Sequence, residues 1–173
     1  CTRIVSEMYS PPRVTAELKQ SKKRFRHVLP GFAFDLAVTD PSDGKPWDFS
    51  RPEKREKARR IIREQRPYML IGSPMCTAFS RLQNINFSKT AKEDVDKVLE
   101  YGTRHMKFCI HLYKMQVENG LYFLHEHPAA ATSWQIPEMV RLMNMPGVRK
   151  IVSHMCAFGM QQHDKEGPGR IYK

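Results

Sequence analysis

Short apolar runs alternate with longer amphipathic segments along nearly the whole chain. The apolar runs have the length of buried β-strands, and the amphipathic segments repeat apolar residues every three or four positions, as helices do. The pattern predicts strands at residues 4–9, 32–38, 68–72, 121–125 and 148–154. It predicts helices at residues 14–25, from the segment Ser50-Arg51-Pro52-Glu53 onward, from Thr90 to Asn119, and at residues 133–144.

The alternation of strands with helices predicts the fold class. Parallel strands need crossover connections, and both faces of a parallel sheet must be covered. We therefore expect an α/β fold with a doubly wound, mostly parallel sheet and helices on both faces. The best-defined helix begins near Thr90, because Val95, Val98, Leu99 and Met106 follow at spacings of three and four.

Length and composition predict one domain that spans residues 1–173, with 40% hydrophobic residues to form its core. The longest uncharged apolar runs are far shorter than the roughly 18 residues that a membrane span needs, so no membrane partner is expected. Scattered cysteines are typical of reduced thiols in an intracellular protein, nuclear in a eukaryote and otherwise cytoplasmic. They are Cys1, Cys76, Cys109 and Cys156. Nothing in the sequence predicts self-association, so we expect a monomer.

The charge balance indicates a polyanionic partner. Lys and Arg outnumber Asp and Glu by 29 to 18, which gives a net charge of +11. A positive surface gains free energy from releasing the counterions of phosphates, although a merely solvated surface is the alternative. The basic residues gather at residues 19–26 and along residues 51–66. We expect part of this charge to border the functional edge of the sheet.

Chemically capable side chains follow the expected strands. In doubly wound sheets, ligands bind beyond the carboxyl ends of the strands. Ser10-Pro11-Pro12-Arg13 follows the first strand, Asp35 lies in the second, and Asp48 comes after it. Cys76 follows the third strand and Glu126 the fourth. Carboxylates and a thiol should therefore meet at one edge.

Two of these segments resemble motifs of a known family. The segment Gly-Ser-Pro-Met-Cys-Thr-Ala-Phe-Ser at residues 72–80 resembles the motif Gly-x-Pro-Cys-Gln-x-Phe-Ser of the C5-cytosine-specific DNA methyltransferases. Met75 is an extra residue here, and Thr77 stands where the family has Gln. Residues 123–128, Phe-Leu-His-Glu-His-Pro, resemble the family's Phe-x-x-Glu-Asn-Val. Over residues 3–160 the chain is similar to the catalytic core of a divergent member.

The resemblance implies a Rossmann-like fold that binds S-adenosylmethionine and transfers its methyl group to carbon 5 of cytosine. Cys76 would be the nucleophile, and Glu126 would contact N3 of the base. The partner would be DNA, with RNA left open, and the target base would be flipped out of the duplex or presented on a single strand. The cofactor would be held by Ser10, Pro11, Asp35, Asp48 and Pro74. The DNA would be contacted by Ser80, Arg81, Gln83 and Asn84.

Departures from the family motifs define the alternatives. The loop at residues 10–13 has no glycine, and the family's later Gln-x-Arg-x-Arg motif is missing. The second hypothesis is therefore a catalytically inactive, methyltransferase-like module that binds nucleic acid. A zinc deaminase is disfavoured because the Pro-Cys-x-x-Cys signature is absent, and no metal site is expected. A chain of this length would be a core truncated at its C-terminus, with no target-recognition domain.

Overall fold

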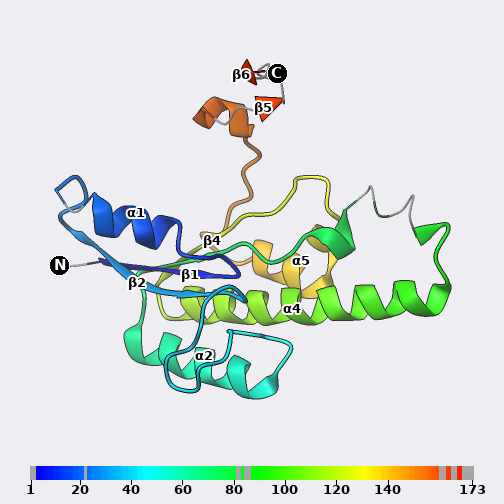
Figure 1. Cartoon of the computed structure of the whole chain (residues 1–173), viewed down its shortest axis with the longest axis horizontal. Coiled ribbons are helices and arrows are strands. Elements are labelled where there is room, and N and C mark those ends of the chain that lie inside the picture. Colours follow the sequence, from blue (N-terminus) through cyan, green and yellow to red (C-terminus); the bar gives the residue numbers. More distant parts are fainter. Residues whose placement is uncertain are drawn as a thin grey trace.

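The computed structural model describes residues 3–21, 23–80, 83, 87–159, 163–164 and 167–168. Its centre is a four-stranded sheet in the order β2-β1-β3-β4, with all strands parallel (Figure 1). The strands are β1 (Arg3–Met8), β2 (Val28–Phe34), β3 (Met69–Gly72) and β4 (Tyr122–His125). The expected α/β class with a parallel sheet is thus confirmed.

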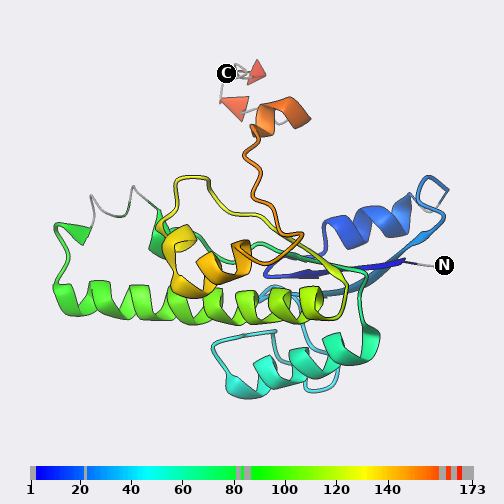
Figure 2. The same cartoon turned by 180° about the vertical axis from the view of Figure 1, so that it is seen from behind.

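Helices lie on both faces of the sheet (Figures 1 and 2). The short helix α1 (Val14–Gln20) packs on β1 and β2 from one side. The helices α2 (Pro52–Gln65) and α4 (Lys92–Glu118) cover the other side, and α5 (Pro137–Met143) packs against α4. The short elements are η1 (Thr77–Phe79), η2 (Thr132–Gln135), η3 (Met155–Phe158), β5 (His163–Asp164) and β6 (Gly167–Pro168).

The core lies between the sheet and α4. Met8 and Leu70 from the sheet are fully buried, together with Cys109 and Tyr113 from α4. Gly72 allows the closest approach, because a methyl group added there would overlap Tyr113 Oη and lie 3.0 Å from Cys109 Sγ. The absence of a side chain at Gly72 therefore sets the distance between β3 and α4.

Several element boundaries differ from the sequence prediction, most clearly those of α1 and β2. The helix α1 ends at Gln20 rather than at residue 25, and β2 begins four residues earlier than expected. The strand β2 stops at Phe34 because Asp35 starts a turn, in which the Ala37 amide donates to the Asp35 side chain at 2.9 Å and the Val38 amide donates to the Asp35 carbonyl. A side chain that accepts from the second residue onward favours a turn over a strand.

The expected strand at residues 148–154 is wrong, since these residues form no regular element. Gly147 adopts a positive φ of 83°, and the Lys150 ammonium lies 4.1 Å from the centre of the Trp134 ring. These features direct the segment toward the side of η2. As a result, β4 is an edge strand, and Tyr122 and Leu124 are 53% and 46% exposed instead of buried.

Candidate active site at the carboxyl edge of the sheet

A small cavity of about 150 Å³ lies at the carboxyl edge, and two of the expected cofactor ligands line it. Asp35 comes from the end of β2, and Asp48 lies between the buried rings of Trp47 and Phe49. The complete lining is Tyr9, Asp35, Leu36, Trp47, Asp48, Phe49, Ser73, Met75 and His105. The fold thus brings Asp35 and Asp48 together, as the sequence predicts.

The surroundings of Asp48 favour the ionised form of its carboxyl group. Burial alone would raise the pKa of this carboxyl group, but hydrogen bonds from Ser50 and the nearby His105 and Arg51 lower it below its usual value. The Ser50 amide donates to Asp48 Oδ1 at 2.8 Å. The cavity therefore presents a negatively charged acceptor beside aromatic rings.

Tyr9 and His105 line this cavity and were missed by the sequence analysis. Tyr9 Oη lies 2.9 Å from His105 Nδ1, and the Tyr9 ring packs on Phe49 with centroids 5.0 Å apart. Burial lowers the pKa of His105 and raises that of Tyr9, so this hydrogen bond joins two neutral groups at pH 7. His105 Nε2 is buried and has no hydrogen-bond partner within the described part of the chain.

His105 carried a signal in the sequence, whereas Tyr9 is marked by its backbone conformation in the structure. His105 occurs on the apolar stripe of α4, one position before Met106 and four before Cys109. Tyr9 follows β1 directly and adopts a positive φ of 53°, a conformation that usually requires glycine. The first loop therefore keeps a left-handed position without a glycine, and ring contacts to Phe49 and His105 hold it there.

The loop that carries Cys76 is anchored on α4. Ala78 and Phe79 in η1 are buried, and Ala78 Cβ lies 2.6 Å from the position that a Cβ on Gly102 would occupy. Pro74 is buried, Cys76 is half-buried at the start of η1, and Met75 reaches the cavity. Cys76 itself does not line the cavity, although its neighbour does.

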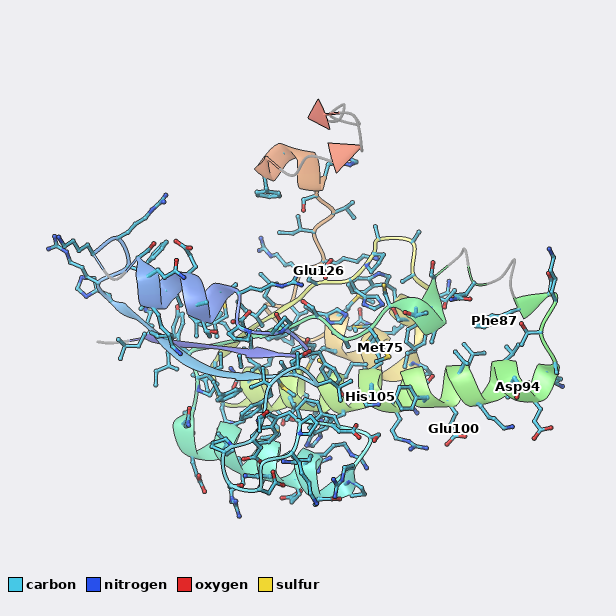
Figure 3. All side chains as sticks on the ribbon, viewed as in Figure 1. Met75, Phe87, Asp94, Glu100, His105 and Glu126 are labelled. Carbon is cyan, nitrogen blue, oxygen red and sulfur yellow. The ribbon has the colours of Figure 1, made fainter. Side chains whose placement is uncertain are left out.

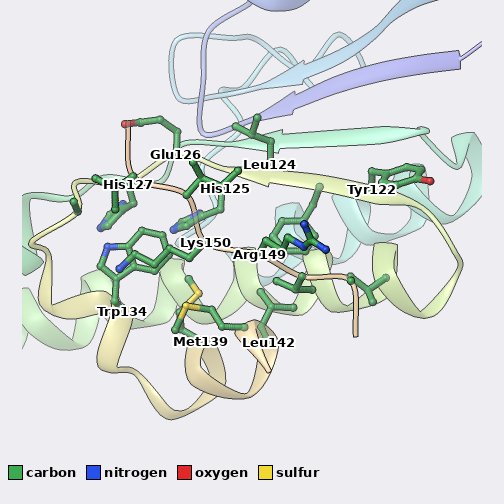
Figure 4. Close-up of a pocket in the computed structure, with 18 of the residues that line it drawn as sticks. Tyr122, Leu124, His125, Glu126, His127, Trp134, Met139, Leu142, Arg149 and Lys150 are labelled. Atoms are coloured by element: carbon green, nitrogen blue, oxygen red, sulfur yellow. The ribbon is translucent and has the colours of Figure 1, made fainter. Parts of the chain in front are cut away.

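Glu126 directly follows β4, the strand next to β3, after which the Cys76 loop begins. Its amide donates to the Gly72 carbonyl at 3.0 Å, which extends the pairing of β3 with β4 by one residue. Its side chain is exposed and turns away from the histidines on either side of it (Figure 4). The structure thus places Cys76 and Glu126 on loops at the same edge but does not enclose them in one cavity. Figure 3 shows Glu126 and Met75, the neighbour of Cys76, at this edge.

The loop at Ser10 and Pro11 is organised by a buried carboxylate. Glu7 is 1% exposed and accepts hydrogen bonds from the Thr15 amide at 2.8 Å and the Thr15 hydroxyl at 2.6 Å. Ser10 and the amides of Arg13 and Val14 donate to it over 3.2–3.4 Å. A helix N-terminus is a ready anion site, and here Glu7 already occupies it. Neither Ser10 nor Pro11 lines the cavity.

Only part of the expected nucleic-acid contact lies within the described residues. Ser80 is half-buried directly after η1, and the Gln83 amide donates to its carbonyl at 3.0 Å. Arg81 and Asn84 lie outside the described residues. Both Ser80 and Gln83 follow the Cys76 loop, as the sequence places them.

The two basic clusters do not form the positive border expected at this edge. On α2, Arg59, Arg60 and Arg63 form ion pairs with Glu56 or Glu64 at 3.0, 3.9 and 3.6 Å. Residues 19–21 and 23–26 lie at the opposite, amino edge, because α1 runs back along the sheet and β2 starts at Val28 (Figure 1). The described residues of these two clusters therefore do not supply the positive charge expected at the Cys76 edge, and the ion pairs on α2 agree with the alternative of a solvated helix face.

A larger pocket of about 800 Å³ opens between β4, α5 and residues 146–153 (Figure 4). The rings of His125 and His127 stack there with centroids 5.3 Å apart, and Trp134 meets them edge-on. Burial lowers the pKa of His125 to about 3 and that of His127 to about 4. His125 Nδ1 lies 3.1 Å from Tyr113 Oη, so this histidine belongs to the core network of α4.

The fold and the site define an α/β protein with a parallel sheet and a polar, aromatic cavity at its carboxyl edge. Among the described residues, no three His, Cys, Asp or Glu side chains group closely enough to hold a metal ion. No helix in the described part of the chain is long and apolar enough to cross a membrane. Comparison of the sequence with models of known protein families and with curated proteins finds no match to either.

Proposed function

We propose that this protein transfers a methyl group from S-adenosylmethionine to carbon 5 of cytosine in DNA, with Cys76 as the nucleophile. The observation that carries the proposal is the cavity in which Asp35 and Asp48 meet beside Met75, one residue before Cys76. The resemblance of the Cys76 and Glu126 segments to the methyltransferase motifs supplies the reaction. The cavity lies at the edge where doubly wound sheets bind their ligands.

The residues of the cavity suit the adenosine end of the cofactor. An aromatic base can pack against the rings that line the cavity, and Asp35 and Asp48 offer carboxylate acceptors to hydroxyl and amino groups. The volume of about 150 Å³ is smaller than a site for a whole drug-sized ligand, so the rest of the cofactor would lie outside it. When bound, S-adenosylmethionine supplies an electrophilic methyl group.

Cys76 and Glu126 would act on the cytosine ring. The Cys76 thiolate forms a bond to carbon 6, and the electron pair of the 5,6 double bond moves into the ring and makes carbon 5 nucleophilic. A carboxyl group at N3, contributed by Glu126, stabilises the charge that develops there. Carbon 5 would then gain the methyl group as the bond between that methyl and the sulfonium sulfur breaks, leaving a neutral thioether. Transfer of the carbon 5 proton to a base and cleavage of the bond between the Cys76 sulfur and carbon 6 would restore the aromatic ring and release the Cys76 thiolate.

One observation favours the second hypothesis, a catalytically inactive module that binds nucleic acid. The amides of Arg13, Val14 and Thr15 donate to Glu7, so these three are already engaged and are not offered to the methionine carboxylate of a cofactor. An inactive module would keep the fold and the basic surface but would bind no S-adenosylmethionine.

A covalent trap separates the two hypotheses. DNA that contains 5-fluorocytosine is incubated with the protein and S-adenosylmethionine, because fluorine at carbon 5 blocks elimination and keeps the sulfur–carbon bond. We expect an adduct of the mass of protein plus methylated DNA, lost in Cys76→Ser and retained in Cys156→Ser. Calorimetry with S-adenosylmethionine should give binding that weakens in Asp48→Asn. If neither an adduct nor cofactor binding is observed, the methyltransferase proposal is refuted and the hypothesis of an inactive module remains.

A further inference from the structure

The amino edge of the sheet carries a row of cationic and aromatic side chains, far from the candidate active site. The starts of the strands follow one another there in the order β2-β1-β3-β4, about 4.8 Å apart. The Arg3 guanidinium lies 4.6 Å from the centre of the Tyr68 ring. Tyr68 in turn packs against Tyr122, with centroids 4.8 Å apart. Tyr122 is 53% exposed, so one ring of this pair faces solvent.

A basic turn continues the row beyond Arg3. The Arg3 amide donates to the His27 carbonyl at 2.9 Å, and the Val28 amide donates to the Phe25 carbonyl at 3.0 Å. These bonds hold the turn between α1 and β2 beside the start of β1. The turn and the end of α1 carry exposed cations. These are Lys19, Lys23, Arg24 and Arg26.

These cations differ from those on α2. Within the described part of the chain, none of the four forms an ion pair with an acidic side chain, whereas Arg59, Arg60 and Arg63 on α2 all do. Unpaired cations in a cluster repel one another and gain when a polyanion replaces the counterions around them. The amino edge therefore carries a group of four exposed cations that have no acidic partner among the described residues.

We propose that this amino edge, defined by Arg3, Tyr68, Tyr122 and the basic turn at residues 23–27, binds single-stranded nucleic acid. Exposed aromatic rings stack on bases, and neighbouring cations contact the phosphates between them. A duplex hides the faces of its bases, so the rings favour a single strand. Stacking and phosphate contacts do not read the edges of the bases, so this mode of binding is independent of sequence.

The site is separate from the proposed catalytic function, because the strands of the sheet lie between the two edges (Figure 1). A methyltransferase that holds a strand here would retain nucleic acid while the carboxyl edge is empty. An inactive module would use the same surface as its main contact. The experiment below therefore uses a strand without cytosine and contains no cofactor, so its outcome does not depend on catalysis.

Fluorescence anisotropy with a labelled twelve-residue oligothymidylate, measured from 50 to 200 mM salt, tests the proposal. The double variant Arg24→Gln/Arg26→Gln should weaken binding at least tenfold and reduce the slope of log affinity against log salt by about 1.4, about 0.7 for each lost phosphate contact. The control is Arg60→Gln/Arg63→Gln on α2, which removes the same charge from paired positions and should change binding less than twofold.

The ring contribution is tested separately. Tyr122→Ala should weaken binding of the oligothymidylate roughly tenfold. Tyr122→Phe should bind as tightly as the wild type, since stacking needs only the ring. Circular dichroism checks that each variant is folded. The proposal is overturned if both double variants weaken binding equally, if Tyr122→Ala has no effect, or if a duplex of equal length binds as tightly. Binding to anionic lipid vesicles without binding to oligothymidylate would also overturn it.

Discussion

Replacing Glu7 should remove one of the largest single contributions to the stability of this fold. Its carboxylate is buried and accepts from five donors, and the two bonds from Thr15, at 2.8 and 2.6 Å, are the shortest. Hydrogen bonds to a charged group contribute about 1.5–3 kcal/mol each, and the remaining bonds are longer and weaker. For Glu7→Ala we expect a loss of about 3–4 kcal/mol of unfolding free energy.

The variant Glu7→Gln should have a smaller effect of about 1–2 kcal/mol. Its amide oxygen can still accept from Thr15, but its NH2 group then faces the amides of Arg13 and Val14, which are donors themselves. The loss of negative charge also removes a favourable interaction with the N-terminus of α1.

Urea denaturation at pH 7, followed by far-ultraviolet circular dichroism, measures these losses. The matched control is Glu17→Gln, because Glu17 also lies in the first turn of α1 but is exposed, and it should change stability by less than about 0.5 kcal/mol. If Glu7→Gln and Glu17→Gln gave equal losses, the account of Glu7 as the organiser of the first loop would be refuted.

Three further predictions concern the core and its charges. Gly72→Ala should destabilise the protein by about 2–3 kcal/mol in urea denaturation, since the added methyl overlaps Tyr113 Oη, and Tyr113→Phe should restore part of the loss. Burial of Asp40 would raise its pKa, but hydrogen bonds from Lys54 and Lys57 hold it well below its usual value. Wild-type stability should therefore fall as the pH drops from about 4 to 2, and Asp40→Asn should flatten this fall while lowering stability at pH 7. Burial lowers the pKa of His127 to about 4 in the folded protein, whereas the ordinary pKa of 6.5 applies to the unfolded chain. Between these two pH values, His127 therefore takes up a proton when the protein unfolds. Stability should rise between these pH values by up to about 1.4 kcal/mol per pH unit from this group, and urea titrations of His127→Phe should lack this contribution.

The sequence was sufficient to predict the parallel sheet and the order of most elements, because hydrophobic periodicity reports burial directly. It was less informative about the helix starts. Ser50 and Thr90 have the spacing of capping residues, yet the residues before α2 and α4 are Arg51 and Ala91, whose side chains form no capping hydrogen bond. At Ser50 the amide donates instead to the side chain of Asp48, two residues earlier, in a local turn that precedes α2.

Only part of the candidate site could be predicted from the sequence. Asp35 and Asp48 could be placed because the carboxyl ends of parallel strands meet at one edge. Tyr9 and His105 lie 96 positions apart in the sequence, so their contact depends on how α4 packs against the sheet and could not be predicted. The role of Glu7 could not be predicted either, because an acid inside a strand normally points to solvent, whereas this one turns to the amides that follow it.

The two outer strands of the sheet differ in how they resist aggregation. The strand β2 contains Pro30, which lacks an N–H group and disfavours addition of another strand. The strand β4 consists of Tyr-Phe-Leu-His, and no strand of the described residues pairs with its outer side. An edge without proline or a charged side chain is a template for strands of other molecules. The yield of refolding should therefore fall with protein concentration, and a charge at exposed Leu124, as in Leu124→Lys, should raise it.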